Sequence, residues 1–146
     1  MKTLYRLYFK EGTAAFGPQA VLEEAGLPHE LVIVDTTTGA QRQPDYLALN
    51  PSGKIPTLVT PEGEVLYETA AIMLYLADRH GLDDLAPPVG HPLRGLFYRS
   101  LFYLSNVLQT DFKRYYYPER FTSDAAGAPQ IKSQAKETLK ESWRPV

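Results

Sequence analysis

The spacing of hydrophobic positions changes several times along the first half of the chain, and each change marks an expected element. Short runs rich in aromatic and β-branched residues, bounded by turn residues, predict strands. Runs with apolar residues three and four positions apart predict helices. In chain order we expect a strand over 3–9, a helix over 16–25, a strand over 30–34, a short helix over 45–49, strands over 57–59 and 65–67, and a helix over 69–80.

Turn and stop residues support these limits. Gly26 follows the first helix, Gly81 follows the last one, and residues 61–64 have the composition of a β-hairpin turn. The order βαβ and then ββα is that of a thioredoxin-like α/β domain. The helical spacing of the first helix rests on Phe16, Ala20, Val21 and Glu24, and that of the last on Ile72, Met73, Leu76 and Ala77.

The second half of the chain has a helical pattern throughout. It follows a proline-rich stretch at 87–92, so we expect a domain at 1–81, a linker at 82–91 and an all-α domain at 92–146. A further helix is expected over 130–143. The first long helix of this part is predicted from apolar residues on one face: Leu93, Leu96, Phe97, Leu101, Leu104, Val107 and Leu108.

Composition narrows the class of protein. The chain has 146 residues, 44% of them hydrophobic and 22% charged, which is typical of a soluble globular protein. A net charge of -2 does not favour a nucleic-acid partner. The absence of cysteine excludes disulfides and any mechanism that uses the protein's own thiol. No secretion signal and no membrane-spanning run is found, so we expect a cytoplasmic protein without a membrane partner.

Two short segments carry the candidate chemistry. Proline cannot donate to a sheet ladder, so Pro56, directly before a strand, predicts a turn or edge and is a candidate cis-proline. Glu68 and Thr69 then offer a carboxylate and a hydroxyl where a helix begins. Together these segments suggest a small-molecule site made of exposed backbone and a helix N-terminus.

These residues resemble the glutathione transferase family. The resemblance rests on N-P-x-G-K-I-P-x-L at 50–58, on x-L-x-E-T-x-A-I at 65–72 and on Y-L-A at 75–77, and it covers residues 3–81. Residues 82–146 resemble the beginning of the family's helical second domain. Members of the family carry several more helices after this point. We therefore expect the helical domain to be incomplete.

The resemblance implies a glutathione site on the first domain, with glutathione as co-substrate. A helix N-terminus suits a carboxylate, so Thr69 would hold that of the γ-glutamyl group and Glu68 would pair with its ammonium. The backbone of Ile55 would bond the cysteinyl unit like an edge strand. Lys54, with Arg42 or Gln43, could meet the glycyl carboxylate. The alternatives are structural: Thr69 as an N-cap, Glu68 as a first-turn acid and Lys54 as a surface lysine.

In this family a hydroxyl or thiol after the first strand activates the glutathione thiol. A hydroxyl that donates to the thiolate lowers a thiol pKa that is otherwise about 8.5. By its place after Gly12, Thr13 best matches the serine of the serine-type classes. The alternative is that Thr13 is a helix N-cap or a loop hydroxyl. Backbone N–H groups between Gly12 and Phe16 could also hold the thiolate.

The remaining expectations concern the second substrate and partners. Phe16, Tyr115 and Tyr116 are candidates for a pocket that binds a hydrophobic electrophile, although core and subunit packing is the favoured alternative for the aromatic residues of the second half. The resemblance implies a homodimeric detoxification enzyme that transfers the glutathione thiolate to an electrophile, with peroxidase and ether-cleaving reactions as possible variants. The alternative is a non-catalytic interaction module. No metal-ligand constellation is found in the sequence.

Overall fold

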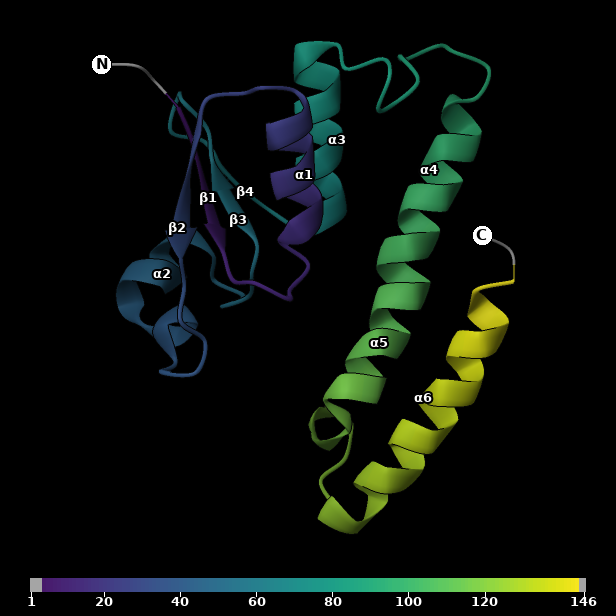
Figure 1. Ribbon diagram of the computed structural model, residues 1–146. Coiled ribbons are helices and arrows are strands. Elements are labelled where there is room, and N and C mark those ends of the chain that lie inside the picture. Colours follow the sequence, from purple (N-terminus) through teal and green to yellow (C-terminus); the bar gives the residue numbers. More distant parts are fainter. Residues whose placement is uncertain (1–3, 145–146) are drawn as a thin grey trace. The chain divides into compact units, whose positions relative to one another are not determined.

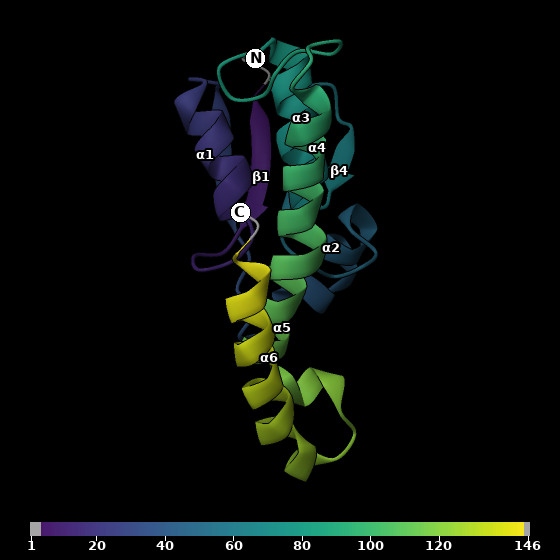
Figure 2. The same cartoon turned by 90° about the vertical axis from the view of Figure 1, so that its right-hand side faces the viewer.

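The chain folds as two compact units that meet between His91 and Pro92, and the computed structural model describes residues 4–144 (Figure 1). The first unit contains a four-stranded sheet with strand order β2-β1-β3-β4. Its helices α1 (Phe16–Glu24) and α3 (Thr69–His80) lie side by side against the sheet, and α2 (Pro44–Leu49) lies apart from them (Figures 1 and 2). The second unit is helical. This architecture confirms a thioredoxin-like domain followed by an all-α domain.

β1 (Tyr5–Phe9) lies inside the sheet and organises the first unit. It pairs in parallel with β2 (His29–Ile33) and antiparallel with β3 (Thr57–Val59). β3 pairs antiparallel with β4 (Val65–Tyr67). Because successive strand residues face opposite sides of a sheet, the buried side chains of β1 alternate with an exposed one. The core of this unit is formed by Tyr5, Leu7, Val21, Leu22, Leu58, Ile72 and Leu76.

Most element limits agree with the sequence prediction. β3, β4 and α3 occupy the predicted residues, whereas the predicted start of β1 at residue 3 lies outside the described residues. β2 begins at His29, one residue earlier than predicted, because its parallel register aligns His29 with Tyr5. α2 begins at Pro44, since proline is well suited to the first turn of a helix.

The buried side of α1 differs from the predicted pattern. Pro18, Val21 and Leu22 are buried, whereas Phe16 is 76% exposed. The helix therefore packs through the stripe of Pro18, Val21 and Leu22. Of the four residues in the predicted pattern, Val21 is buried, whereas Phe16, Ala20 and Glu24 are exposed.

The segment after α3 belongs to the first unit. Gly81 ends α3 in the left-handed conformation at φ 60°, which glycine adopts without strain. The N–H of Leu82 donates to the C=O of Ala77 at 2.9 Å. Leu82 packs against the core, and Ala86 is buried. Residues 82–91 are thus attached to the α/β unit by hydrogen bonds and apolar contacts.

The second unit begins with a nearly continuous helix and ends with an antiparallel partner. α4 (Arg94–Tyr103) continues through a π-helical turn (Leu104–Leu108) into α5 (Gln109–Tyr116). Two 3-10 turns (Pro118–Phe121 and Ala125–Gly127) lead to α6 (Ala128–Ser142), which begins two residues earlier than predicted. Among the helices within residues 4–144, none combines the length and apolar character needed to cross a membrane.

α6 packs along α5 and the π-helical turn (Figure 1). The carboxylate of Asp111, which is buried, accepts hydrogen bonds from Arg114 at 3.0 Å and from Ser142 at 3.2 Å. Leu108 is buried in the same region, whereas Leu93, directly before α4, and Leu96 are exposed, although both belong to the predicted apolar face. Only the part of this face that α6 covers is buried within the second unit.

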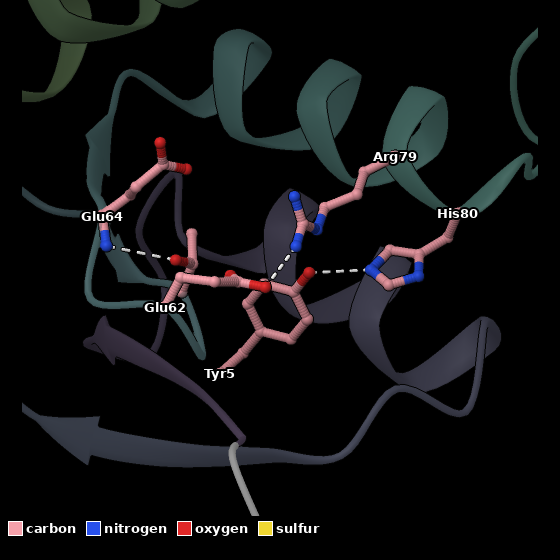
Figure 3. Close-up of polar contacts among 6 residues, drawn as sticks. Tyr5, Glu62, Glu64, Arg79 and His80 are labelled. Atoms are coloured by element: carbon pink, nitrogen blue, oxygen red, sulfur yellow. Dashed lines mark hydrogen bonds and ion pairs between the residues drawn. The ribbon is translucent and has the colours of Figure 1, made fainter.

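A polar cluster ties the C-terminal end of α3 to β1 and to the β3–β4 hairpin (Figure 3). The buried Tyr5 forms a 2.7 Å hydrogen bond with the Nε2 atom of His80, and the two rings meet edge to face. Arg79 forms an ion pair with Glu62 in the hairpin turn. Burial raises the pKa of Tyr5 and, together with the charge of Arg79, lowers the pKa of His80. The neutral imidazole is therefore the form that this contact favours.

This cluster predicts a loss of stability in mild acid. The folded pKa of His80 lies below its usual value near 6.5, so the unfolded chain binds the proton more readily. His80 then makes its full contribution to the free energy of unfolding above about pH 6.5, and this contribution is lost as the pH falls. We expect wild type to lose more unfolding free energy between pH 8 and pH 5 than His80→Gln does, measured by urea denaturation. At pH 8 the unfolding free energies of the two proteins should differ only by the lost hydrogen bond. If the unfolding free energy of both proteins fell equally with pH, the lowered pKa of His80 would be contradicted.

Candidate functional site

The turn before β3 presents an open stretch of backbone. The Ile55–Pro56 peptide bond is cis, and Pro56 is buried. Ile55 is half-buried and lies outside the sheet, since β3 begins at Thr57. None of the hydrogen bonds among residues 4–144 uses the backbone N–H or C=O of Ile55. These two polar groups are therefore available to an extended ligand.

A buried side-chain network holds this turn. The Asn50 side chain, 1% exposed, accepts hydrogen bonds from the N–H and the hydroxyl of Ser52 at 3.1 and 2.7 Å. Its amide group donates to the C=O of Lys54 and to the hydroxyl of Thr57, both at 3.0 Å. The Tyr46 hydroxyl donates to the same C=O at 2.6 Å. The sequence prediction missed Tyr46, Asn50 and Thr57, although an Asn before Pro-Ser-Gly is a turn signal.

The start of α3 lies at the same end of the sheet. The register pairs Thr57 with Tyr67, the last residue of β4, and Glu68 and Thr69 follow directly. Glu68 has φ 74° and ψ 115°, the one positive φ of a non-glycine residue within the described chain. Its side chain is exposed. Such backbone strain costs about 1–3 kcal/mol and occurs mostly at functional positions.

The first turn of α3 supplies free donors. The first intrahelical hydrogen bond runs from the N–H of Ile72 to the C=O of Glu68 at 3.0 Å. The amides of residues 69–71 precede it and have no partner within the helix. The positive end of the helix dipole is at the same place. This end of α3 can accept a carboxylate, and the Glu68 carboxylate beside it can accept a cation.

The loop after β1 is attached to this helix start. The Thr69 hydroxyl donates to the C=O of Ala14 at 3.2 Å. Gly17 allows α1 to approach closely, since a Cβ atom there would lie 2.7 Å from the Met73 sulfur and 3.4 Å from the Thr69 methyl group. The loop that carries Thr13 is thus brought next to the Glu68–Thr69 pair. Gly17 was not predicted to contribute, because a lone glycine gives no such signal in sequence.

Thr13 uses its hydroxyl within its own loop. The hydroxyl donates its single proton to the C=O of Lys10 at 2.6 Å and accepts from the N–H of Ala15 at 3.3 Å. This is the loop-hydroxyl arrangement given above as the alternative to catalysis. For Thr13 to donate to a thiolate, its hydroxyl must turn away from Lys10.

The three polar candidates for the far end of the site differ in their contacts. Arg42 donates to the C=O of Ser52 at 3.3 Å, and its side chain lies where a Cβ on Gly53 would come within 2.7 Å. Lys54 and Gln43 are exposed. Gln43 precedes α2, with its backbone N–H bonded to Ala40. Arg42 is therefore the candidate that the structure places directly on the Ser52–Gly53 turn.

The predicted pocket residues belong to different units. Phe16 is in the first unit, while Tyr115 and Tyr116 are in α5 of the second. The rings of Tyr115 and Tyr116 meet edge to face with centroids 5.1 Å apart, and the Lys132 ammonium lies 5.0 Å from the Tyr115 ring centroid. Tyr115 is half-buried and Tyr116 is 64% exposed. Their role in a pocket stays a prediction.

Taken together, fold and site define a thioredoxin-like domain that offers an open strand backbone and a helix N-terminus on one end of its sheet. Within residues 4–144, no group of three or more His, Asp or Glu side chains is placed to share a metal ion. The chemistry available is that of hydrogen bonds, one exposed carboxylate and a helix dipole. Such a site suits a small zwitterionic peptide.

Comparisons with known proteins identify the family. Residues 15–79 match the family model for the glutathione S-transferase N-terminal domain. Glutathione S-transferase 3 of Zea mays is 54% identical over 69 residues, or 46% of this chain and 31% of the relative. Glutathione S-transferase GstA of Escherichia coli O157:H7 is 30% identical over 135 residues, or 92% of this chain and 66% of the relative.

A solved structure agrees with this assignment. The crystal structure of a glutathione transferase homologue from Sulfitobacter, with bound glutathione, superposes with a TM-score of 0.86 at 28% identity over 95% of this chain and 66% of that one. The chain thus spans between 31% and 66% of the length of these relatives. It belongs to the glutathione transferase family.

The strain at Glu68 can be measured with two variants that both lack the carboxylate. Glycine tolerates a positive φ better than alanine does, so Glu68→Gly should be more stable than Glu68→Ala by about 1 kcal/mol. The difference is measured by chemical denaturation of the free proteins. If alanine proves equal or better, the positive φ at this position carries no strain.

Proposed function

We propose that this protein binds glutathione at the end of the sheet formed by Ile55, Glu68 and Thr69, and transfers its thiolate to an electrophile. One observation carries the proposal: the unbonded backbone of Ile55 and the strained start of α3 lie at the same end of β3 and β4. The names of the relatives and the glutathione bound in the homologue from Sulfitobacter support it.

The γ-glutamyl end of glutathione would lie at α3. Its carboxylate accepts from the first-turn amides of α3 and from the Thr69 hydroxyl, which first has to leave the C=O of Ala14. Its ammonium pairs with Glu68, whose exposed side chain is free to turn toward the ligand. Both charged ends of an amino acid are thereby recognised within one turn of helix.

The remainder of glutathione would extend along the turn before β3. The N–H and C=O of Ile55 form strand-like hydrogen bonds with the cysteinyl unit. Arg42, on the Ser52–Gly53 turn, and Lys54 provide cations for the glycyl carboxylate. Arg42 is the stronger of the two loop candidates and Gln43 the weaker, because the Arg42 side chain bonds this turn.

The thiol would then point toward the loop of Thr13. Transfer requires that the thiol lose its proton to solvent and that the sulfur lone pair form a bond to an electrophilic carbon, which releases its leaving group. A hydroxyl or an N–H that donates to sulfur favours the charged form. Thr13 would supply the hydroxyl once it turns from Lys10, and free N–H groups between Gly12 and Ala14 would act beside it.

The electrophile would be hydrophobic. Its candidate contacts are Phe16 in the first unit and Tyr115 and Tyr116 in the second. The ring of Phe16 favours this idea, because a large apolar side chain that is 76% exposed is available to a ligand. A cytoplasmic homodimer with a role in detoxification completes the proposal and follows from the family alone.

A second candidate function is a binding module that holds glutathione without activating it. The hydrogen bond from Thr13 to Lys10 favours this alternative, since it occupies the one hydroxyl proton in the loop. The two functions differ in a single quantity, which is the pKa of the thiol when glutathione is bound.

Replacement of Glu68 tests the recognition of the ammonium. Glu68→Gln keeps the shape and removes the charge, so glutathione affinity should fall by about tenfold to a hundredfold, the range for a charge-assisted hydrogen bond. Isothermal titration calorimetry measures the change. Glu64→Gln, which removes an exposed carboxylate from β-hairpin residues outside the site, is the matched control and should bind like wild type. Equal affinities of all three proteins would leave Glu68 as a structural first-turn residue.

Replacement of Thr13 tests the activation of the thiol. The absorbance of the bound thiolate near 240 nm, followed against pH, gives its pKa; about 8.5 is expected for an unassisted thiol. Wild type should titrate below this value, Thr13→Ala closer to it, and Thr13→Ser, which keeps the hydroxyl, like wild type. A wild-type pKa equal to that of free glutathione would support the binding module, and an unchanged pKa in Thr13→Ala would assign activation to the backbone N–H groups.

A further inference from the structure

Four polar groups close a ring of hydrogen bonds beneath the turn at Ile55. The Tyr46 hydroxyl donates to the C=O of Lys54 at 2.6 Å, so its only proton is used there. It lies 2.9 Å from the Thr57 hydroxyl, which must therefore donate to it. The Asn50 amide donates both its protons, one to Thr57 and one to Lys54. Every proton in the ring has one partner.

The ring is inside the protein. Tyr46 is 6% exposed, Asn50 1% and Thr57 not at all. A buried polar group that loses its partner costs about 1–3 kcal/mol, so the ring resists any rearrangement of one member alone. Burial also raises the pKa of Tyr46, so its hydroxyl remains a donor well above neutral pH.

The consequence reaches the neighbouring N–H group. The peptide unit that joins Lys54 to Ile55 is planar and rigid, so its C=O and its N–H point in opposite directions. Two donors that hold the oxygen on the inner side of the turn also fix the N–H of Ile55 on the outer side. Hydrogen bonds to the oxygen polarise the amide and strengthen its N–H as a donor.

We propose that Tyr46, supported by Asn50 and Thr57, is a positioning residue that aims the N–H of Ile55 at a peptide carbonyl of the ligand. The inference rests on the proposed function, because the ligand is glutathione and the carbonyl is that of its cysteinyl unit. Tyr46 does not touch the ligand. It acts through the peptide unit whose oxygen it holds.

Two ligands and two variants test this role. Glutathione is compared with γ-glutamylcysteamine, which has the γ-glutamyl group and the thiol but lacks the cysteinyl carbonyl. Tyr46→Phe should lower the affinity for glutathione by roughly three- to tenfold, the range for one hydrogen bond. Its affinity for γ-glutamylcysteamine should stay within about twofold of the wild-type value, because that ligand has no carbonyl to accept from the N–H of Ile55. Calorimetric dissociation constants are the readout.

Tyr5→Phe is the matched control. It also removes one buried tyrosine hydroxyl from the first unit, but at the opposite end of β1, where Tyr5 bonds His80. It should lower the unfolding temperature, as Tyr46→Phe does, while both ligands bind like wild type. If Tyr46→Phe does not fold, Thr57→Val is used instead. It keeps both donors to the C=O of Lys54 but removes the hydroxyl that bonds Tyr46 and Asn50, so it should show the same selectivity between the ligands with a smaller loss of glutathione affinity.

The outcomes separate the two proposals. Failure of the wild-type protein to bind glutathione would overturn the proposed function and this inference with it. Normal binding by wild type and unchanged glutathione affinity in both ring variants would overturn only the role of Tyr46. Equal weakening of both ligands would also overturn it, because that result indicates general loosening of the site rather than a misdirected N–H group.

Discussion

The carbonyl of Lys54 and the two buried donors that it accepts from, Tyr46 and Asn50, form the constraint on which the entry to β3 depends. Inside a protein, polar groups without a partner are costly, so these side chains satisfy one another and the hydroxyl of Thr57. The next peptide unit is left with its N–H pointing away from them. The hydrogen bonds on the inner side of the turn are all made between protein groups. On the outer side, the N–H and C=O of Ile55 remain without a partner among the described residues.

The elements that meet at this end of the sheet come from distant parts of the sequence. The end of β1 pairs with the beginning of β3, and the beginning of β3 pairs with the end of β4. Because α3 follows β4 directly, it starts next to the loop that follows β1. The bond from Thr69 to Ala14 and the close approach at Gly17 join these two segments. The site therefore consists of element ends, where backbone groups are not used by the sheet or the helix.

The opposite end of the same elements has a different character. There Tyr5 bonds His80, and Glu62 pairs with Arg79, so the hairpin turn, β1 and the end of α3 are joined by side chains (Figure 3). These side chains bond to one another at that end. At the end of Ile55 and Glu68, the positive φ of Glu68 and the unbonded backbone of Ile55 are the features that support the proposed ligand site.

The sequence alone determined the order of elements, because hydrophobic spacing and glycine stops are local, and the limits of β3, β4 and α3 followed directly from them. It also pointed to Ile55, Glu68 and Thr69 through a short family motif. Tertiary structure decided which polar groups are already in use: that Thr13 donates to Lys10, that Arg42 lies on the Ser52–Gly53 turn and that Tyr46 lies beneath Ile55. These choices depend on hydrogen bonds between segments, whose geometry follows from packing and cannot be obtained from spacing along the chain.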